Sequence, residues 1–277
     1  MLTDTFALKG TICYSISPQE LSITPNSYLI CSQGKCAGIF PALPEKYRGI
    51  PCTDYKDDLI IPGLTDLHVH APQYTFRASG MDLELLDWLN TYAFPQEARY
   101  ENLEFARSAY SIFAEDMKKS PNTRACIFGT LHVPATELLM ELMDKTGLKT
   151  MIGKVNMDRN GSPILQETSA EASAQATVTW IEDTLNRFEN TTPILTPRFT
   201  PACTDQLMAK LSQIQKKYHL PMQSHLSENF GEIEWVKELC PSTHFYGEAY
   251  HQFQLFGGDC PTIMAHCVYS SEEELAL

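Results

Sequence analysis

The 277-residue chain lacks two features that would point to large charged or membrane partners. It has no apolar run long enough to span a bilayer, so a membrane-spanning helix is not expected. It also has no excess of positive charge, because 34 acidic residues outnumber 21 lysines and arginines and give a formal net charge of −13. This balance argues against nucleic acid and anionic membranes as partners.

The nine cysteines show no Cys-x-x-Cys spacing, which argues against a compact zinc or redox motif built from them. Their number is odd, and residues 1–9 include Asp4 and no sustained apolar region, so no secretory signal is expected there. Reduced thiols in a cytoplasmic protein are the simplest interpretation of these observations.

The most informative stretch is residues 60–70, with the sequence Ile-Ile-Pro-Gly-Leu-Thr-Asp-Leu-His-Val-His. We predict a short apolar strand, bounded by a Pro-Gly pair, that carries His68 and His70. Side chains alternate along a strand, so these two histidines project from one face. Two adjacent imidazoles suit a divalent metal, although a hydrogen-bonded histidine pair at a strand end is the alternative.

Residues 1–60 are predicted to form a separate region, a small antiparallel β-sheet that is part of a β-sandwich. Two β-prone runs, Phe6–Ile12 and Ser27–Cys31, are separated by Ser, Pro, Asn and Gly turn residues. We therefore expect two domains, the sheet at residues 1–60 and a larger domain at residues 61–277.

Strands and amphipathic helices alternate in the larger domain. In residues 102–118, for example, apolar residues recur every three or four positions, which predicts a helix. Repeated strand–helix pairs form right-handed βαβ units with a parallel sheet, so the predicted class is α/β of the (β/α)8 TIM-barrel type. A closed barrel needs eight strands. We count six and expect an incomplete barrel, with strands at residues 60–70, 124–130, 149–155, 193–199, 220–225 and 261–266.

Three of the predicted strands end in histidine, at His70, His225 and His266. Functional residues gather at the C-terminal ends of the strands in parallel α/β folds. One such histidine would carry little weight, but three are expected to meet at a metal site. Three unrelated polar strand ends are the alternative.

Two further charged residues lie near the ends of predicted strands, Arg198 within its strand and Glu228 just after one. Glu228, three residues after His225, is either a carrier for the proton of a metal-bound water or an acid at a helix N-terminus, and its position favours neither. Arg198 offers a planar fork of donors suited to a carbonyl or ring nitrogen of a flat polar substrate, with a surface salt bridge as the alternative. Phe199 beside it is a stacking wall or part of the core.

Taken together, these motifs resemble those of the guanine deaminases in the amidohydrolase superfamily. The resemblance covers nearly every residue from 58 to 277. The His-x-His strand marks the superfamily, whereas Gln73, the Trp-Leu and Phe-Pro pairs and Thr-Pro-Arg-Phe are more specific to guanine deaminases. The segments that carry the resemblance are Pro62–Tyr74, Leu86–Leu89 with Phe94-Pro95, Gly153–Asp158, Thr196–Phe199, Gln223–Asn229 and Met264–His266.

The resemblance implies a reaction and assigns residues to it. It implies hydrolytic deamination of guanine to xanthine and ammonia, a step of purine catabolism, by a cytoplasmic homodimer with one Zn²⁺ per chain. A zinc-activated water would attack the guanine carbon that bears the amino group, and Glu228 would be the catalytic proton shuttle. The implied metal ligands are His68, His70, His225 and His266, and the implied substrate-binding residues are Gln73, Arg198, Phe199, His225 and Glu228.

Lys154, in the third predicted strand of the larger domain, resembles a position at which some binuclear enzymes carry a modified lysine. A structural ion pair is the preferred interpretation. The Pro-Cys-x-x-Cys signature of the zinc cytidine-deaminase type does not occur in the sequence.

The sequence departs from the family pattern at one point. The family's last metal ligand is an aspartate on the eighth barrel strand, which also acts as a base toward water, and residues 1–277 include no such strand. We therefore expect a C-terminally truncated guanine deaminase with an open parallel edge that is weakly stable and deaminates guanine poorly or not at all. Deamination of another heterocycle, and a non-catalytic isoform that acts by binding partners, are the two alternatives.

Overall fold

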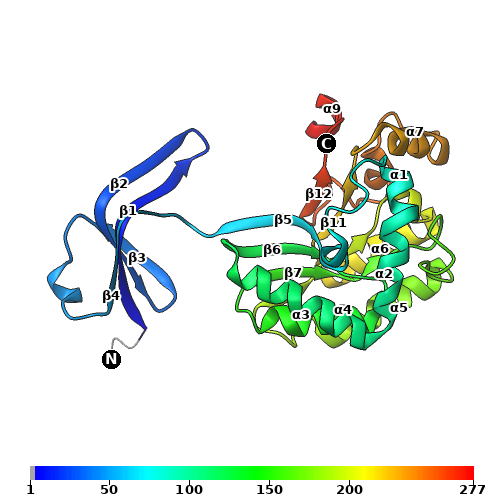
Figure 1. Cartoon of the computed structure of the whole chain (residues 1–277). Helices are drawn as coiled ribbons and strands as arrows, with labels where there is room; N and C mark the ends of the chain where they lie inside the picture. Colours follow the sequence, from blue (N-terminus) through cyan, green and yellow to red (C-terminus); the bar gives the residue numbers. More distant parts are fainter. Residues whose placement is uncertain (1–3) are drawn as a thin grey trace. The chain divides into compact units, whose positions relative to one another are not determined.

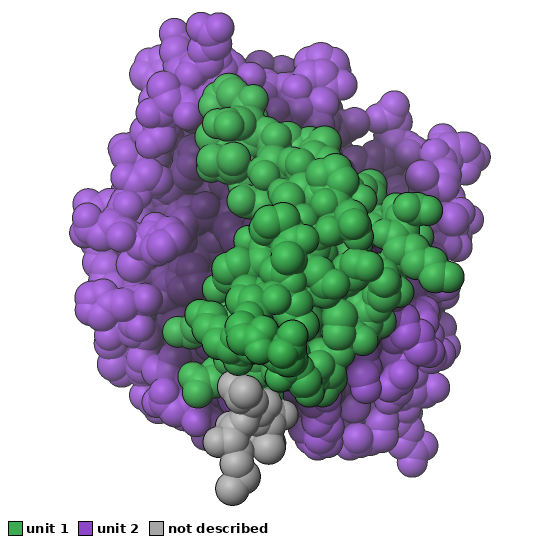
Figure 2. Space-filling view, turned by 90° about the vertical axis from the view of Figure 1, so that its left-hand side faces the viewer, with its two compact units in different colours: residues 1–63 green, residues 64–277 purple. Residues whose placement is uncertain are grey.

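The computed structural model describes residues 4–277 and divides the chain into two compact units, Met1–Gly63 and Leu64–Leu277, which are coloured separately in Figure 2. The division follows the Pro-Gly pair that precedes the histidine strand, and such pairs commonly interrupt regular structure. Every helix among residues 4–277 is too short or too polar to cross a bilayer.

Unit 1 is a four-stranded sheet in the order β3-β2-β1-β4. Neighbouring strands are antiparallel except for β4, which is parallel to β1, so the prediction of a purely antiparallel sheet is wrong at this edge. Residues 41–51 connect β3 to β4 and are long enough to return the chain to the other edge of the sheet, whereas a tight hairpin would have forced an antiparallel pair. The strands are β1 (Thr5–Ser17), β2 (Glu20–Ser32), β3 (Lys35–Phe40) and β4 (Cys52–Ile60).

Unit 2 has α/β architecture, and its paired strands are all parallel, as predicted (Figure 1). One sheet has four strands in the order β5-β6-β7-β9. Two further sheets have two strands each, β8-β10 and β11-β12. A parallel bridge between Leu195 and Met222 links the chain between β9 and β10 to β11. The strands are β5 (Leu64–His70), β6 (Asn122–Phe128), β7 (Lys149–Gly153), β8 (Val155–Asn156), β9 (Thr191–Pro193), β10 (Thr196–Pro197), β11 (Met222–Leu226) and β12 (Thr262–His266).

Two predicted strands, at residues 149–155 and 193–199, are each divided in the structure. The first is β7 and β8 with Lys154 between them, and the second is β9 and β10 with Ile194-Leu195 between them. The two divided strands remain neighbours on both sides of the breaks, because β7 pairs with β9 and β8 pairs with β10, while Leu195 forms a bridge to Met222. Periodicity along one strand does not predict where the hydrogen-bonded pairing between two strands is interrupted.

The helices of unit 2 begin at well-defined caps. The Asn102 side chain accepts hydrogen bonds from the backbone N–H groups of Glu104 and Phe105 and thereby starts α3, one residue after the predicted start. Ser169 and Thr204 cap two further helices in the same way. The helices are α1 (Leu85–Trp88), α2 (Phe94–Ala98), α3 (Leu103–Lys119), α4 (Val133–Asp144), α5 (Ala170–Thr184), α6 (Asp205–Tyr218), α7 (Phe230–Leu239), α8 (Glu248–His251) and α9 (Glu272–Ala276).

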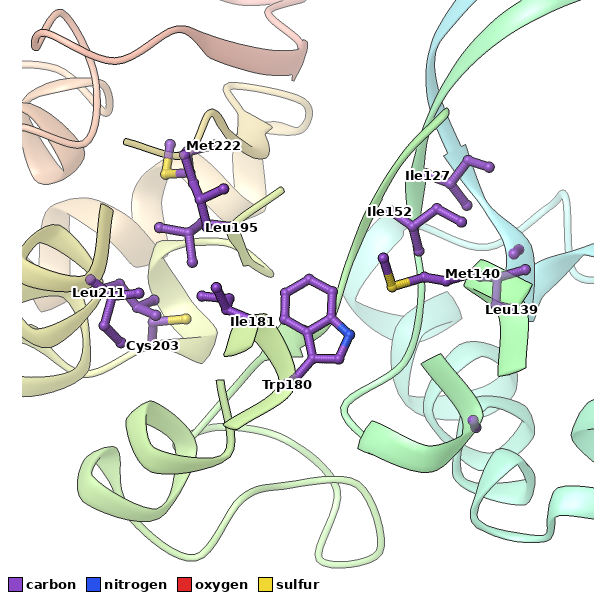
Figure 3. Close-up of a cluster of buried hydrophobic side chains, with 14 of the residues drawn as sticks. Ile127, Leu139, Met140, Ile152, Trp180, Ile181, Leu195, Cys203, Leu211 and Met222 are labelled. Carbon is purple, nitrogen blue, oxygen red and sulfur yellow. The ribbon is translucent and has the colours of Figure 1, made fainter. Parts of the chain in front are cut away.

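The larger of two hydrophobic clusters in unit 2 joins its strands and helices. Trp180 on α5 is fully buried and lies between two groups of apolar side chains in Figure 3. One group includes Ile127 and Ile152 from β6 and β7, and the other includes Leu195 and Met222. Because a buried aromatic side chain removes a large apolar area from water, this packing holds the strand ends in place.

Candidate metal centre and substrate pocket

Three histidines from two strands converge at the C-terminal ends of the strands of unit 2. His68 and His70 come from β5, and His225 comes from β11. One ring nitrogen from each of the three lies within 4.8 Å of the others. The Nε2 atoms of His70 and His225 are 3.0 Å apart. We call these three residues the histidine cluster.

The histidine cluster has the protonation state that a metal ligand needs. Burial, together with the neighbouring His266, lowers the pKa of His68 to about 4. Burial and neighbouring histidines hold the pKa values of His70 and His225 well below their ordinary range. These imidazoles are therefore neutral near pH 7, and a neutral imidazole has a lone pair free for a cation.

A hydrogen bond to the backbone orients His225, one member of the histidine cluster. The Nδ1 atom of His225 lies 2.6 Å from the carbonyl oxygen of Arg198, which can only accept, so Nδ1 carries the proton and Nε2 is free to ligate. The Nδ1 atom of His68 is buried and has no hydrogen-bond partner. An unpaired buried nitrogen beside two other imidazoles fits a site for a cation.

His266, the fourth predicted ligand, lies beside the cluster at the end of β12. Its ring stacks on that of His225, with a centroid separation of 5.4 Å and an interplanar angle of 16°. Its Nε2 atom is 3.3 Å from Oε2 of Glu228. The structure thus brings three of the four predicted ligands within 4.8 Å of one another and pairs the fourth with the predicted proton shuttle.

A cavity of about 190 Å³ opens onto the histidine cluster, and we call it the pocket. Every residue predicted from the sequence to bind metal or substrate lines it. Three apolar residues from the segment around α1, which sequence analysis did not place in the site, complete the wall. The lining residues are His68, His70, Gln73, Leu85, Trp88, Leu89, Arg198, Phe199, His225, Glu228 and His266.

Glu228 has the properties of a group that exchanges protons near neutral pH. Burial is the main cause that raises its pKa to about 7, and the neighbouring Glu232 adds to the effect. The alternative role at a helix N-terminus is taken by Asn229, whose side chain accepts from the N–H of Gly231 at the start of α7. Glu228 therefore faces the pocket without capping the helix.

Arg198 is buried, with 2% of its surface exposed, so the surface salt bridge considered for it is excluded. Its two terminal nitrogens donate to the carboxylate of Glu97, which is equally buried. The Nε2 atom of Gln73 donates to Oε1 of the same carboxylate at 2.9 Å. Glu97 thus ties together two residues that line the pocket.

Comparison with known proteins places this geometry in a family. Residues 59–277 match the model of the Amidohydrolase family. The chain belongs to the amidohydrolase family. Amidohydrolases are metal-dependent, and the histidine cluster can hold a metal ion.

Two curated relatives of this amidohydrolase are guanine deaminases. The chain is 37% identical to that of Dictyostelium discoideum, over 97% of this chain and 63% of the relative. It is 42% identical to that of Mus musculus, over 79% of this chain and 48% of the relative. The chain therefore corresponds to between about half and two thirds of the relatives that it matches.

A solved structure agrees with these relatives. The crystal structure of guanine deaminase from C. acetobutylicum, with guanine bound in its active site, superposes with a TM-score of 0.94 and is 41% identical. The superposition covers 99% of this chain and 65% of the other. The amidohydrolase fold, α/β with a parallel sheet, is thereby shown for this chain.

Lys154 lies outside the pocket of this amidohydrolase. Its side chain is fully buried and forms an ion pair with Glu167, so the predicted structural ion pair is confirmed. Glu167 also accepts from the backbone N–H of Met157 at 3.1 Å. Like Glu97–Arg198, this pair joins a glutamate to a buried basic side chain, but neither of its two residues lines the pocket.

Sequence analysis missed Glu97. The available signal was an acidic residue two positions after the Phe-Pro pair, within a segment that is otherwise mostly apolar. Glu97 and Arg198 are 101 positions apart in the chain. Local patterns do not report a pairing over that distance, so the structure was needed to find it.

Proposed function

We propose that this chain carries the metal- and substrate-binding portion of a guanine deaminase. The observation that carries the proposal is the convergence, in one pocket, of the histidine cluster with Arg198, Gln73 and Glu228. The bound guanine in a structure 41% identical to this chain supports guanine as the ligand. Because the chain spans 63% and 48% of the two relatives, the activity of a whole deaminase is proposed for it by similarity.

The metal in this proposal is a single Zn²⁺. His68, His70 and His225 would hold it, and His266 lies beside them as a further ligand. Imidazole nitrogens are common zinc ligands, and the unpaired buried Nδ1 of His68 fits the requirement for a cation. When bound, the ion supplies Lewis acidity that lowers the pKa of water.

The residues of the pocket have separate tasks in the proposed reaction. Arg198 and Gln73 orient the purine through hydrogen bonds, and Phe199, which is 5% exposed, forms an apolar wall. Glu228 accepts a proton from the incoming water and delivers it to the ring nitrogen. The oxygen of this water forms a bond to the carbon that bears the amino group. The bond between that carbon and the amino group then breaks, and the remaining hydroxyl proton leaves with the amino group, so that guanine and water yield xanthine and ammonia.

The proposal extends to architecture and assembly. Unit 2 is an incomplete (β/α)8 barrel, which its parallel strands and alternating helices support. Unit 1 is part of a β-sandwich, supported by an apolar groove of about 530 Å³ on its sheet that includes Ile12, Leu29 and Ile60. A cytoplasmic homodimer completes the proposal on the strength of the family resemblance.

Turnover by the 277-residue chain alone is proposed to be weak or absent. The group that converges on the candidate metal centre consists of three histidines, without a carboxylate among the residues 4–277 that the structure describes. The carboxylate in the pocket, Glu228, pairs instead with His266. Binding of zinc and purine is therefore the property to measure first.

The test is equilibrium dialysis of the zinc-loaded chain with labelled guanine, adenine and cytosine. Guanine is expected to bind at least about tenfold more tightly than either competitor, which corresponds to about 1.4 kcal/mol. Phe199→Ala should weaken guanine binding, whereas His219→Asn on the exposed surface should not. Tighter binding of another ring would favour the alternative of a different heterocyclic substrate, and equal binding of all three would refute a purine site.

A further inference from the structure

Glu97 holds two pocket residues at once but does not itself line the pocket. Its Oε1 atom accepts from Gln73 Nε2 at 2.9 Å and from Arg198 Nη2 at 3.0 Å, and its Oε2 atom accepts from Arg198 Nη1. Glu97 is 2% exposed, so water does not compete for these bonds. The segment that places it begins with Phe94-Pro95 at the start of α2.

The direction of these hydrogen bonds decides what Gln73 shows to a ligand. A carboxylate only accepts, so the amide of Gln73 must turn its NH₂ group toward Glu97. The carbonyl oxygen of Gln73 is then left to accept a hydrogen bond in the pocket. Arg198 only donates, and its guanidinium has further N–H groups beyond the two that Glu97 engages.

We propose that Glu97 is a positioning residue that sets substrate specificity. By holding both side chains, it makes Gln73 present a hydrogen-bond acceptor to the ligand and Arg198 present a donor beside it. The complementary ligand has a carbonyl next to a ring N–H, as a 6-oxopurine does. A 6-aminopurine has the opposite order, with a donor next to a ring acceptor, and leaves buried polar groups unpaired, which is costly. The inference rests on the proposed purine site and names the feature of the ring that the site selects.

A second buried ion pair provides a matched control. Glu167 pairs with Lys154, which has a fully buried side chain, and neither residue lines the pocket. Replacing either Glu97 or Glu167 by glutamine removes one negative charge that faces a buried cation, at nearly unchanged volume. A general loss of packing or stability would follow both changes, whereas a change of ligand preference is expected only from Glu97→Gln.

The binding experiment compares guanine with 2,6-diaminopurine, which differs at the 6-position and in the adjacent ring N–H. The unaltered zinc-loaded chain is expected to prefer guanine by at least about 100-fold. Glu97→Gln should reduce this preference by at least about tenfold, because a glutamine can donate as well as accept and releases the amide of Gln73 to turn. Glu97→Asp, which keeps an acceptor-only group, should retain part of the preference, and Glu167→Gln should retain all of it.

A ligand-free measurement keeps the inference independent of guanine binding. The side-chain NH₂ resonances of Gln73, identified by their loss in Gln73→Ala, report the bond to Glu97 in an NMR spectrum. Glu97→Gln is expected to shift them and accelerate their exchange with water, and Glu167→Gln is not. Unchanged resonances in Glu97→Gln would overturn the inference, as would an unchanged ligand preference. If the resonances respond but the unaltered chain binds no purine, the positioning role of Glu97 stands and the proposed function fails.

Discussion

The two ends of the parallel strands of unit 2 both form cavities, but only one end has the chemistry of a site. The cavity at the C-terminal ends is the pocket, of about 190 Å³, and the cavity at the N-terminal ends is larger, about 260 Å³. The larger cavity is lined by residues such as Arg124, Lys149 and Glu189. Cavity size therefore does not identify the site, whereas convergence of buried polar groups does.

Strand β7 shows the same contrast within a few residues. Gly147 and Lys149 lie at its N-terminal end and are exposed, whereas Gly153 and Lys154 lie at its C-terminal end and are buried. The exposed Nζ atom of Lys149 donates to the backbone carbonyl of Glu189 and to the side-chain oxygen of Asn190. The buried Nζ atom of Lys154 forms an ion pair with the carboxylate of Glu167. Replacing the lysine at the C-terminal end is therefore expected to lower the free energy of unfolding far more than replacing the lysine at the N-terminal end.

The strongest test of this contrast uses two histidines near opposite ends of β11. His225→Ala removes a member of the histidine cluster and is expected to weaken zinc binding by more than about 100-fold. His219→Asn, on the exposed side before the strand, should leave zinc binding unchanged. Competition with a chromophoric chelator measures both affinities. Equal zinc affinity of the two variants would contradict the proposal that the histidine cluster is the metal centre.

The two lysines flanking β7 give the next largest expected effect. Lys154→Met leaves the largely buried carboxylate of Glu167, whose side chain is 9% exposed, without its partner and should lower the free energy of unfolding by about 3–5 kcal/mol. Lys149→Met removes exposed hydrogen bonds and should cost less than about 1 kcal/mol. Urea unfolding followed by tryptophan fluorescence measures both. Similar losses would show that the two ends of the strand do not differ in this respect.

The smallest contrast comes from the two glycines around the same strand. A Cβ atom on Gly153 would lie 1.6 Å from Oγ1 of the buried Thr196, so Gly153→Ala should cost about 3 kcal/mol through overpacking. Gly147 has a φ of +80° and no atom within 4 Å of such a Cβ, so Gly147→Ala should cost only about 1 kcal/mol of backbone strain. Thermal unfolding by circular dichroism ranks the pair, and a larger loss from Gly147→Ala would contradict the packing seen at Thr196.

Much of the fold of unit 2 was predictable because it depends on patterns of residues that are close together in the sequence. The alternation of strands and helices, the parallel pairing and the helix that begins near Asn102 all follow from periodicity and capping over a few residues. The placement of His68, His70, His225 and His266 near one another followed from the rule that parallel strands share a functional edge.

Other features depended on contacts between distant parts of the chain. The parallel pairing of β4 and the pairing of His266 with Glu228 are each decided by which segments become neighbours. Glu97 was missed for the same reason, since its partner Arg198 lies 101 positions away.

The sequence by itself determined which residue types stand at the strand ends, and therefore that imidazoles, a guanidinium and a carboxylate were available for metal and purine chemistry. Only the tertiary structure decided how they are protonated and which way they face. Burial moves the pKa values of His68 and Glu228, and the hydrogen bonds of Glu97 orient Gln73. Desolvation and hydrogen-bond direction arise only when distant segments pack together, so a sequence pattern does not contain them.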